Sequence, residues 1–164
     1  MELKDVYAYN PETGIFTWKI NKTRARAGAS TGCPNRGGYL RTVYEGVTYS
    51  VARLAWFLYY NEWPKNDLDH INGNRIDNSL KNLRLATRQQ NMANKKYHKN
   101  SSSNFKGVYW RKSIKKWVAS ISLNKERFYL GAFNDEIEAA RAYDLKAKEL
   151  FGEYAKLNIK GEEH

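Results

Sequence analysis

The sequence predicts an α+β fold built from two consecutive domains. Between residues 65 and 97, two short strand patterns, a polar loop and a helix-start signal follow one another, which predicts a compact ββα unit. Residues 105–159 contain three strand-like runs and then one amphipathic helix, which predicts a three-stranded antiparallel sheet packed on one helix. The polar, Ser-rich residues 98–104 contain no apolar anchor and are the predicted linker.

The first domain is predicted to span residues 1–97, and its part up to about residue 50 is rich in strand patterns. Aromatic and β-branched residues bounded by turn residues predict strands within Gly14–Lys19 and Gly38–Tyr44. The mostly apolar run Val51–Tyr60 predicts a helix, which is ended by residues 61–64.

The ββα unit is predicted from two short strands, at Leu68–His70 and Leu83–Ala86, joined by a polar loop. Thr87 stands at the N-cap position of the following helix, and Gln90 stands three residues further on. This spacing is typical of a capping box, in which each side chain satisfies the other residue's backbone N–H. The helix is expected to run to about Tyr97.

The second domain is predicted from three strand-like runs, Gly107–Arg111, Trp117–Leu123 and Arg127–Phe133. A helix over Asp135–Phe151 follows, with Asn134 as its expected cap and Gly152 as its expected end. Apolar residues at helical spacing are expected to face the sheet: Ile137, Ala140, Tyr143, Ala147, Leu150 and Phe151.

The charge balance indicates a polyanionic partner. The chain has 28 Lys and Arg against 17 Asp and Glu, a formal net charge of +11, and nucleic acid is the commonest polyanion. A merely soluble basic protein is the alternative. Every apolar run is far too short for a membrane span, so no membrane partner is expected. A single cysteine and the lack of a signal-peptide pattern favour a reducing, intracellular site.

The residues with the clearest chemical meaning lie in the ββα unit. Asp69 and His70 end a strand, where successive side chains point to opposite sides, so they can take different roles. A carboxylate is a hard ligand suited to Mg²⁺, and an imidazole can accept a proton from water near neutral pH. Asn91, in the helix, can supply a second metal oxygen, and the amide of Asn82 can bond loop backbone and hold the loop closed. A lone Asp–His pair is, however, usually an ordinary strand-end pair.

The run Asp69-His-Ile-Asn-Gly-Asn-Arg-Ile-Asp-Asn-Ser-Leu-Lys-Asn-Leu-Arg-Leu-Ala-Thr-Arg-Gln-Gln-Asn91 closely resembles the HNH nuclease motif of phage and intron homing endonucleases. The variant is the one whose third letter is Asn. The resemblance implies His70 as general base, Asn82 as the structural middle residue, and Asp69 and Asn91 as ligands of one Mg²⁺ or Mn²⁺ in the active site. Arg84 or a nearby Lys is the candidate to hold a phosphate oxygen.

The resemblance covers roughly residues 39–94, and one departure from the family pattern lies within it. Many relatives have His where this chain has Ala52. That His is not the catalytic one in this interpretation, so activity is expected to survive while an auxiliary contact is lost.

The three predicted strands of the second domain interleave basic and aromatic residues. One face of such a sheet must pack on the final helix, and the other can present alternate residues to solvent. The expected members of that open face are Tyr109, Arg111, Ser120, Ser122, Arg127 and Tyr129. A narrow antiparallel sheet with a basic outer face can enter the DNA major groove. A solvated face with partly buried aromatic residues is the alternative.

Four segments between about residues 104 and 158 resemble the Apetala-two (ethylene-response-factor) DNA-binding domain. They are Phe105-Lys-Gly-Val-Tyr-Trp-Arg, Lys116-Trp-Val-Ala-Ser-Ile, Tyr129-Leu-Gly-Ala-Phe133 and Glu138-Ala-Ala-Arg-Ala-Tyr-Asp144. The resemblance implies that the sheet reads the major groove, with DNA-facing places at Lys106, Tyr109, Arg111, Ser120, Ser122, Arg127 and Tyr129. Tyr109, Ser120 and Ser122 replace charged residues common in the plant proteins, so base preference does not transfer.

The expected function is therefore that of a metal-dependent HNH DNA endonuclease of the phage homing type, which nicks or cleaves DNA at a preferred site. It is expected to act in the cytoplasm, or in the host cytoplasm if the gene is phage-encoded. A monomer is slightly favoured, and with one catalytic unit per chain its simplest product is a nick, whereas a dimer could cut both strands. Two alternatives stay open: a non-catalytic, sequence-specific DNA-binding protein such as a transcription regulator, and a non-specific nuclease.

Overall fold

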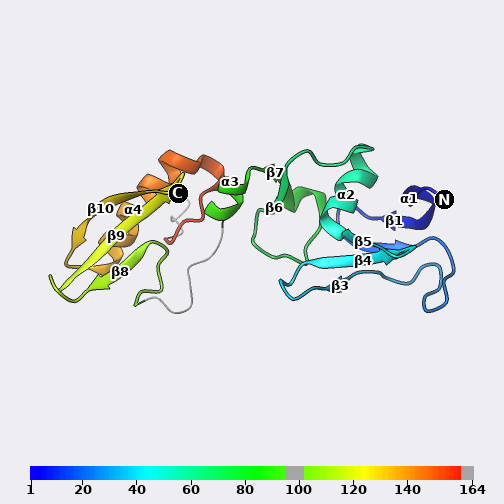
Figure 1. Cartoon of the computed structure of the whole chain (residues 1–164), viewed down its shortest axis with the longest axis horizontal. Helices are drawn as coiled ribbons and strands as arrows, with labels where there is room; N and C mark the ends of the chain where they lie inside the picture. The colour runs from blue at the N-terminus through cyan, green and yellow to red at the C-terminus, as the bar shows by residue number, and fades with distance from the viewer. Residues whose placement is uncertain (95–101, 160–164) are drawn as a thin grey trace. The chain divides into compact units, whose positions relative to one another are not determined.

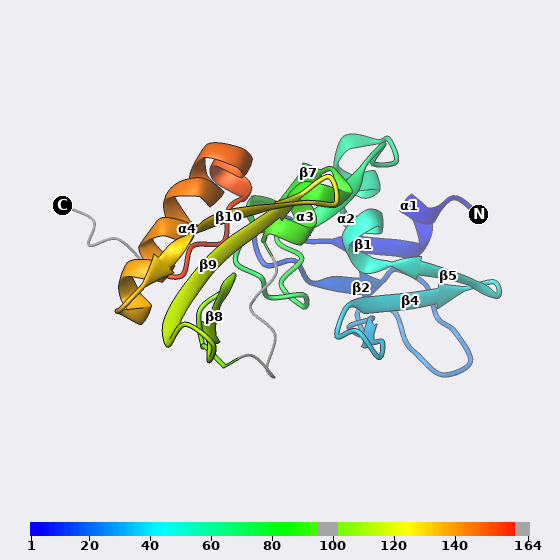
Figure 2. The same ribbon diagram turned by 60° about the vertical axis from the view of Figure 1, so that its left-hand side comes forward.

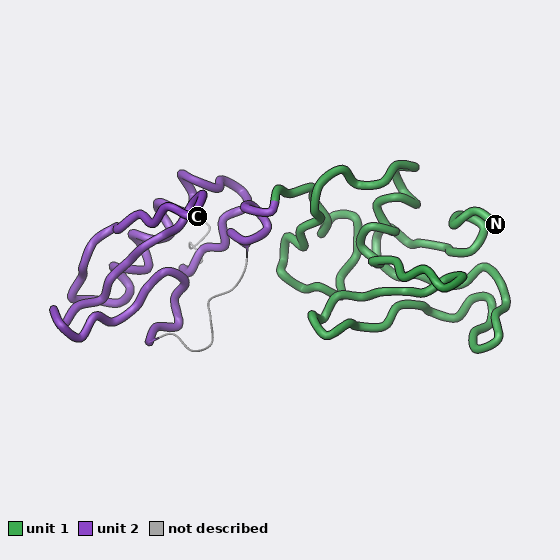
Figure 3. The backbone as a smooth tube through the Cα atoms, viewed as in Figure 1, with its two compact units in different colours: residues 1–87 green, residues 88–164 purple. Residues whose placement is uncertain are grey.

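The computed structural model describes residues 1–94 and 102–159 (Figure 1). Most of the predicted linker thus lies outside the described residues. The helix predicted to run to about Tyr97 is shorter than expected: it ends at Ala93, and Asn94 lies in a turn. The chain divides into two compact units, residues 1–87 and 88–164 (Figure 3). Antiparallel sheets and helices make up both units, which confirms the predicted α+β class. Within the described part of the chain, no helix combines the length and apolar character needed to cross a membrane.

The elements of unit 1 are, in chain order, α1 (Leu3–Val6), β1 (Tyr7–Tyr9), β2 (Phe16–Trp18), β3 (Cys33–Pro34), β4 (Leu40–Tyr44), β5 (Val47–Ser50), α2 (Val51–Tyr60), β6 (Asp67–His70), the 3-10 turn η1 (Leu80–Asn82) and β7 (Leu83–Ala86). Strands β1 and β2 form an antiparallel hairpin, β3, β4 and β5 form an antiparallel sheet in that order, and β6 pairs antiparallel with β7. The predictions of α2, β6 and β7 are confirmed, and β2 and β4 lie within the predicted runs.

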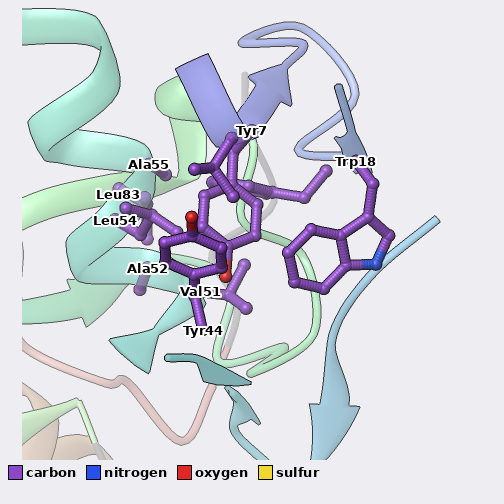
Figure 4. Packing of buried hydrophobic residues seen from close by; sticks show 10 residues of the cluster. Tyr7, Trp18, Tyr44, Val51, Ala52, Leu54, Ala55 and Leu83 are labelled. Atoms are coloured by element: carbon purple, nitrogen blue, oxygen red, sulfur yellow. The ribbon is translucent and has the colours of Figure 1, made fainter. Parts of the chain in front are cut away.

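The core of unit 1 forms where α2 meets the aromatic residues of the strands. Val51, Leu54 and Ala55 are spaced so that they share one face of α2, and each is at most 1% exposed. Figure 4 shows these residues beside the rings of Tyr7 and Tyr44. The Tyr7 ring lies 4.7 Å from that of Trp18, centroid to centroid, and its buried hydroxyl bonds Thr42 Oγ1 at 3.2 Å. This packing fixes α2 on the sheet, and the chain then turns through Asn61, which has a left-handed φ of 60°.

Ala52 also belongs to this core and is only 6% exposed. Position 52 is therefore filled by a small apolar side chain that packs inside unit 1.

The elements of unit 2 are α3 (Arg88–Ala93), β8 (Val108–Arg111), β9 (Lys116–Leu123), β10 (Glu126–Phe133), α4 (Glu136–Phe151) and the 3-10 turn η2 (Gly152–Tyr154). The three strands form one antiparallel sheet in the order β10-β9-β8, as predicted. Figure 2 shows α4 lying alongside this sheet. A register shift between Tyr129 and Gly131 marks a β-bulge in β10.

Two details of the α4 prediction are wrong. The N-cap is Asp135, not Asn134, because the Asp135 carboxylate accepts hydrogen bonds from the backbone N–H groups of Ile137 and Glu138. Ile137 does not face the sheet and is 47% exposed. The buried face runs through Ala139, Ala140, Tyr143 and Ala147, and a residue two positions before Ala139 lies on the opposite side of the helix.

Helix α3 is held by the remainder of unit 2. The ammonium of Lys106 donates to the backbone carbonyls of Met92 and Ala93 at the end of α3, and the N–H of Lys156 donates to Ala93 at 3.4 Å. A basic side chain on the last carbonyls of a helix stabilises its C-terminus. The helix that follows the ββ strands thus belongs, by its contacts, with the second sheet.

Gly14 in the β1–β2 turn permits a close backbone approach. It has a φ of +72°, and a Cβ there would lie 2.3 Å from Ser79 N and 2.5 Å from Asn78 C. Gly46 in the β4–β5 turn has a similar φ of +77°, but a Cβ there would meet nothing within 4 Å. The first turn therefore lies directly on the chain that leads into β7, and the second does not touch it.

We expect Gly46→Ala to cost about 1 kcal/mol of unfolding free energy through backbone strain alone. Gly14→Ala should cost about 2 kcal/mol more, because the added methyl group must displace backbone rather than a flexible side chain. Urea unfolding of the two variants checks this. Equal losses would show that the hairpin does not pack on residues 78 and 79 in solution.

Candidate active site and DNA-contacting face

Asp69 is buried and paired with a guanidinium group. The antiparallel register of β6 and β7 places Asp69 opposite Arg84, and directly opposite residues on one face of such a pair are in reach of each other. Nε and Nη2 of Arg84 donate to Asp69 Oδ2 at 3.0 Å and 2.9 Å. The carboxylate is 4% exposed, so the ion pair compensates for the loss of water around its charge.

His70, the next residue, is 5% exposed and lies opposite Leu83. Its Nε2 is 3.2 Å from Asn78 Oδ1, and its ring centroid is 5.8 Å from that of Tyr39. Burial lowers the pKa of the His70 imidazole below its ordinary value, while the Asn78 hydrogen bond and the Asp69 charge oppose that shift. A neutral imidazole at neutral pH is the form that can accept a proton.

The loop between β6 and η1 is closed by side-chain amides. The Asn82 Oδ1 accepts the backbone N–H of Asn72 at 2.9 Å, and Asn82 Nδ2 donates to the Asp77 carbonyl at 2.7 Å. The Asp77 carboxylate accepts from both the N–H and the hydroxyl of Ser79 and from Asn72 Nδ2. The Ser79 hydroxyl bond is the main cause that lowers the pKa of the Asp77 carboxyl. These bonds make the loop a fixed frame around His70.

Sequence reasoning missed Asp77, Asn78 and Tyr39. The Asp–x–Ser spacing of residues 77–79 is a local turn signal that could have identified Asp77. No such signal exists for Asn78, because its 1% exposure results from contacts with distant residues of the chain.

The predicted metal ligands lie in different units. Asp69 is in β6 of unit 1, and Asn91 is in α3, which belongs to unit 2. Among residues 1–94 and 102–159, no group of three or more His, Cys, Asp and Glu side chains is arranged to hold a metal ion. The buried carboxylate of Asp69 is a donor suited to a Mg²⁺-like ion, which commonly binds through one or two carboxylates together with water and substrate phosphate.

The sheet of unit 2 brings three of the predicted DNA-facing residues together. Nε and Nη2 of Arg127 donate to the Ser120 hydroxyl at 3.1 Å and 2.9 Å, and the guanidinium lies 5.2 Å from the centre of the Tyr109 ring. Ser122 and Arg111 are exposed, and Tyr129 is 63% exposed, opposite the buried Ser120. Arg127 is thus a cation held in a fixed orientation on this face.

Lys106 is placed differently from the other members of that predicted set. Its ammonium bonds the end of α3, and its backbone N–H and carbonyl bond the Asn158 side chain at 2.6 Å and 3.0 Å. In this structure Lys106 joins α3 and the C-terminal segment to the sheet.

Two family models match consecutive segments of the chain. The HNH endonuclease family model matches residues 49–93, and the AP2 domain model matches residues 103–153. The chain is 30% identical over 89 residues to Protein 3.8 of Escherichia phage T7, which covers 54% of this chain and 73% of that protein. The chain belongs to the HNH endonuclease family. It carries an AP2 domain after the HNH segment, which confirms the order expected from the two resemblances.

Two further relatives each resemble part of this HNH protein. An uncharacterized HNH endonuclease of Acanthamoeba polyphaga mimivirus is 44% identical over 92 residues, which are 56% of this chain and 46% of the relative. A dehydration-responsive element-binding protein of Arabidopsis thaliana is 38% identical over 79 residues, which are 47% of this chain and 38% of the relative. The chain thus spans about half the length of the mimivirus relative.

The buried His70 ring predicts that stability depends on pH. Its pKa is lower in the folded chain than in the unfolded chain, where histidine titrates near about 6.5. The contribution of the buried, neutral His70 to the unfolding free energy is therefore fully present above the pKa of the unfolded state. It is lost as the pH falls through the lowered pKa of the folded state. Between about pH 7 and pH 5, we expect the unfolding free energy to fall more steeply in wild type than in His70→Gln. Urea titrations across this window test the difference, and parallel curves would contradict it.

Proposed function

We propose that this protein is a metal-dependent DNA endonuclease of the homing type, which nicks or cleaves DNA at a preferred site. The observation that carries the proposal is the buried Asp69–His70 pair at the end of β6, inside the segment that matches the HNH endonuclease family. It places an anionic oxygen and a proton acceptor on adjacent residues, and hydrolysis of a phosphodiester needs both.

In the proposed reaction, His70 accepts a proton from a water molecule as that water attacks the phosphorus. The new bond is between the water oxygen and phosphorus, and the bond that breaks joins phosphorus to the 3′ oxygen. The products are a 5′-phosphate and a 3′-hydroxyl; the 3′ oxygen takes its proton from solvent water, and His70 returns its proton to solvent. Burial supports this role for His70, because it keeps the imidazole neutral and ready to accept the proton.

Asp69 and Asn91 are the proposed ligands of the single divalent cation, Mg²⁺ or Mn²⁺. When bound, the cation would neutralise the charge that grows on the phosphate and the leaving oxygen. Asp69 suits this task because it is a carboxylate whose Oδ2 is fixed by Arg84. We propose that Arg84 also attracts the DNA phosphate, for which a guanidinium is well suited. Asn82 has the supporting role of closing the loop.

DNA binding is proposed for the outer face of the β8–β10 sheet, through Tyr109, Arg111, Ser120, Ser122, Arg127 and Tyr129, with Lys106 at its edge. A net charge of +11 and the AP2 match support DNA as the partner. The intracellular DNA of a cell, or of a host infected by a phage, is the proposed substrate. A monomer with one catalytic unit would nick one strand.

One observation favours a second function, a DNA-binding regulator without hydrolysis. The buried charge of Asp69 is already compensated by Arg84. A site that never binds a metal cation would need this ion pair to keep the carboxylate buried. The two functions differ in one testable respect: only the endonuclease cleaves DNA in a reaction that requires His70.

We expect wild-type protein with Mg²⁺ or Mn²⁺ to cut DNA from its own genomic locus, and His70→Ala to stop cleavage while leaving DNA binding unchanged. The reason is that His70 acts on water and does not hold the DNA. Gel assays of cleavage and of mobility shift measure the two properties side by side, and a chelator should reproduce the loss in wild type. Discrete fragments indicate a preferred site, whereas a smear indicates a non-specific nuclease. If the DNA stays intact with both Mg²⁺ and Mn²⁺ and with every genomic locus tested, the result would favour a DNA-binding regulator without hydrolysis.

Arg127→Ala is expected to weaken DNA binding about tenfold, because Arg127 is held on the open sheet face by Ser120 and Tyr109. Arg141→Ala is the matched control: it also removes one exposed positive charge of unit 2, but from α4. Fluorescence anisotropy at several salt concentrations measures both. If the two variants lose affinity equally, the sheet face is not the DNA-contacting surface.

A further inference from the structure

Asn78 is a buried polar residue that the proposed reaction does not yet use. Its side chain is 1% exposed, and its Oδ1 lies 3.2 Å from Nε2 of His70. Its Nδ2 donates to the carbonyl of Ile76 at 3.1 Å. Both ends of the amide are therefore occupied, and neither reaches solvent.

The contact with Ile76 determines which end of the amide faces His70. A backbone carbonyl can only accept a hydrogen bond, so the group that faces Ile76 must be the NH₂. The amide oxygen then faces the imidazole, and this oxygen can also only accept. The hydrogen of a neutral His70 ring must accordingly be on Nε2, which leaves the lone pair on Nδ1.

We propose that Asn78 is a positioning residue that sets the tautomer and the ring orientation of His70. Nδ1 is then the atom that accepts the proton from water, and Nε2–H is the atom that holds the ring in place. The catalytic consequence rests on the proposed function of His70 as general base, whereas the tautomer itself does not.

Asn78 is in turn held by the hairpin of β1 and β2, which lies far away in the sequence. The Tyr9 hydroxyl donates to the Asn78 carbonyl at 2.9 Å, and the Leu80 N–H donates to the Pro11 carbonyl at 2.8 Å. A Cβ on Gly14 would lie within 2.5 Å of Asn78 C, so the turn packs directly against this backbone. The N-terminal hairpin is therefore part of the support for the His70 ring.

Loss of the acceptor oxygen removes the preference for one tautomer. A ring free to carry its hydrogen on Nδ1 has no lone pair on the atom that must take the proton. Since general-base catalysis contributes about 10² to 10⁴-fold, a variant without the acceptor should lose about 10²-fold in cleavage rate. DNA affinity should stay the same, because Asn78 is buried.

The test is ¹⁵N NMR of the imidazole groups in the full chain at about pH 8, where histidine is neutral. The chain has three histidines, so His70→Gln identifies the signals of His70 by their loss. We expect wild-type His70 to show a protonated Nε2 and an unprotonated Nδ1. Asn78→Leu, which removes the acceptor at similar volume, should lose this pattern and about 10²-fold of the cleavage rate.

Two further variants separate positioning from general stability. Asn78→Asp loses the donor to Ile76 but keeps an acceptor oxygen toward Nε2, and it should therefore keep the Nε2–H tautomer. Tyr9→Phe removes only the bond to the Asn78 backbone, and should lower stability while leaving the tautomer unchanged.

The inference is overturned if wild-type His70 carries its hydrogen on Nδ1, or if Asn78→Leu keeps both the wild-type tautomer and the wild-type rate. Should Asn78→Leu not fold, the wild-type and Asn78→Asp spectra decide the question. If wild type shows the expected tautomer but cuts no DNA, the proposed function fails and the assignment of the tautomer stands.

Discussion

The structure of this site depends on one constraint: two adjacent ionisable side chains, Asp69 and His70, are each at most 5% exposed. A buried polar or charged group is destabilising unless it is paired. Asp69 takes Arg84 across the β6–β7 ladder, and His70 takes Asn78 from the intervening loop. Asn78 lies in the loop after β6, and Arg84 lies in β7. The two strands and this loop must therefore keep one geometry for Asp69 and His70 to remain buried.

The two units divide the proposed tasks. Unit 1 contains the Asp69–His70 pair, and unit 2 contains the basic sheet with its fixed Arg127. Helix α3 carries Asn91, the proposed second metal ligand, and its last carbonyls bond Lys106 and Lys156 of unit 2. The helix that carries this proposed ligand is therefore held within unit 2, the unit proposed to bind DNA.

The sequence was most informative where structure is local. The helix over Val51–Tyr60 and the strands β6 and β7 follow from periodicity and turn residues, and the two family resemblances follow from motif spacing. The predictions fail at two kinds of feature: the cap and the buried face of a helix, which can differ by one residue, and contacts between segments that are distant in the sequence. The apolar character of Ile137 predicts a place on the buried face of α4, but the buried alanines set the phase of the helix and leave Ile137 exposed. The Arg84 pair and the Asn78 contact depend on tertiary register, which local patterns do not contain.

The central claim is that water, activated at His70, breaks the bond between phosphorus and the 3′ oxygen. Cleavage of the target DNA in ¹⁸O-labelled water, followed by mass spectrometry of both new ends, tests it most directly. The account predicts one ¹⁸O atom in the 5′-phosphate and an unlabelled 3′-hydroxyl. A 3′-phosphate, or a 5′-phosphate without the label, would contradict it.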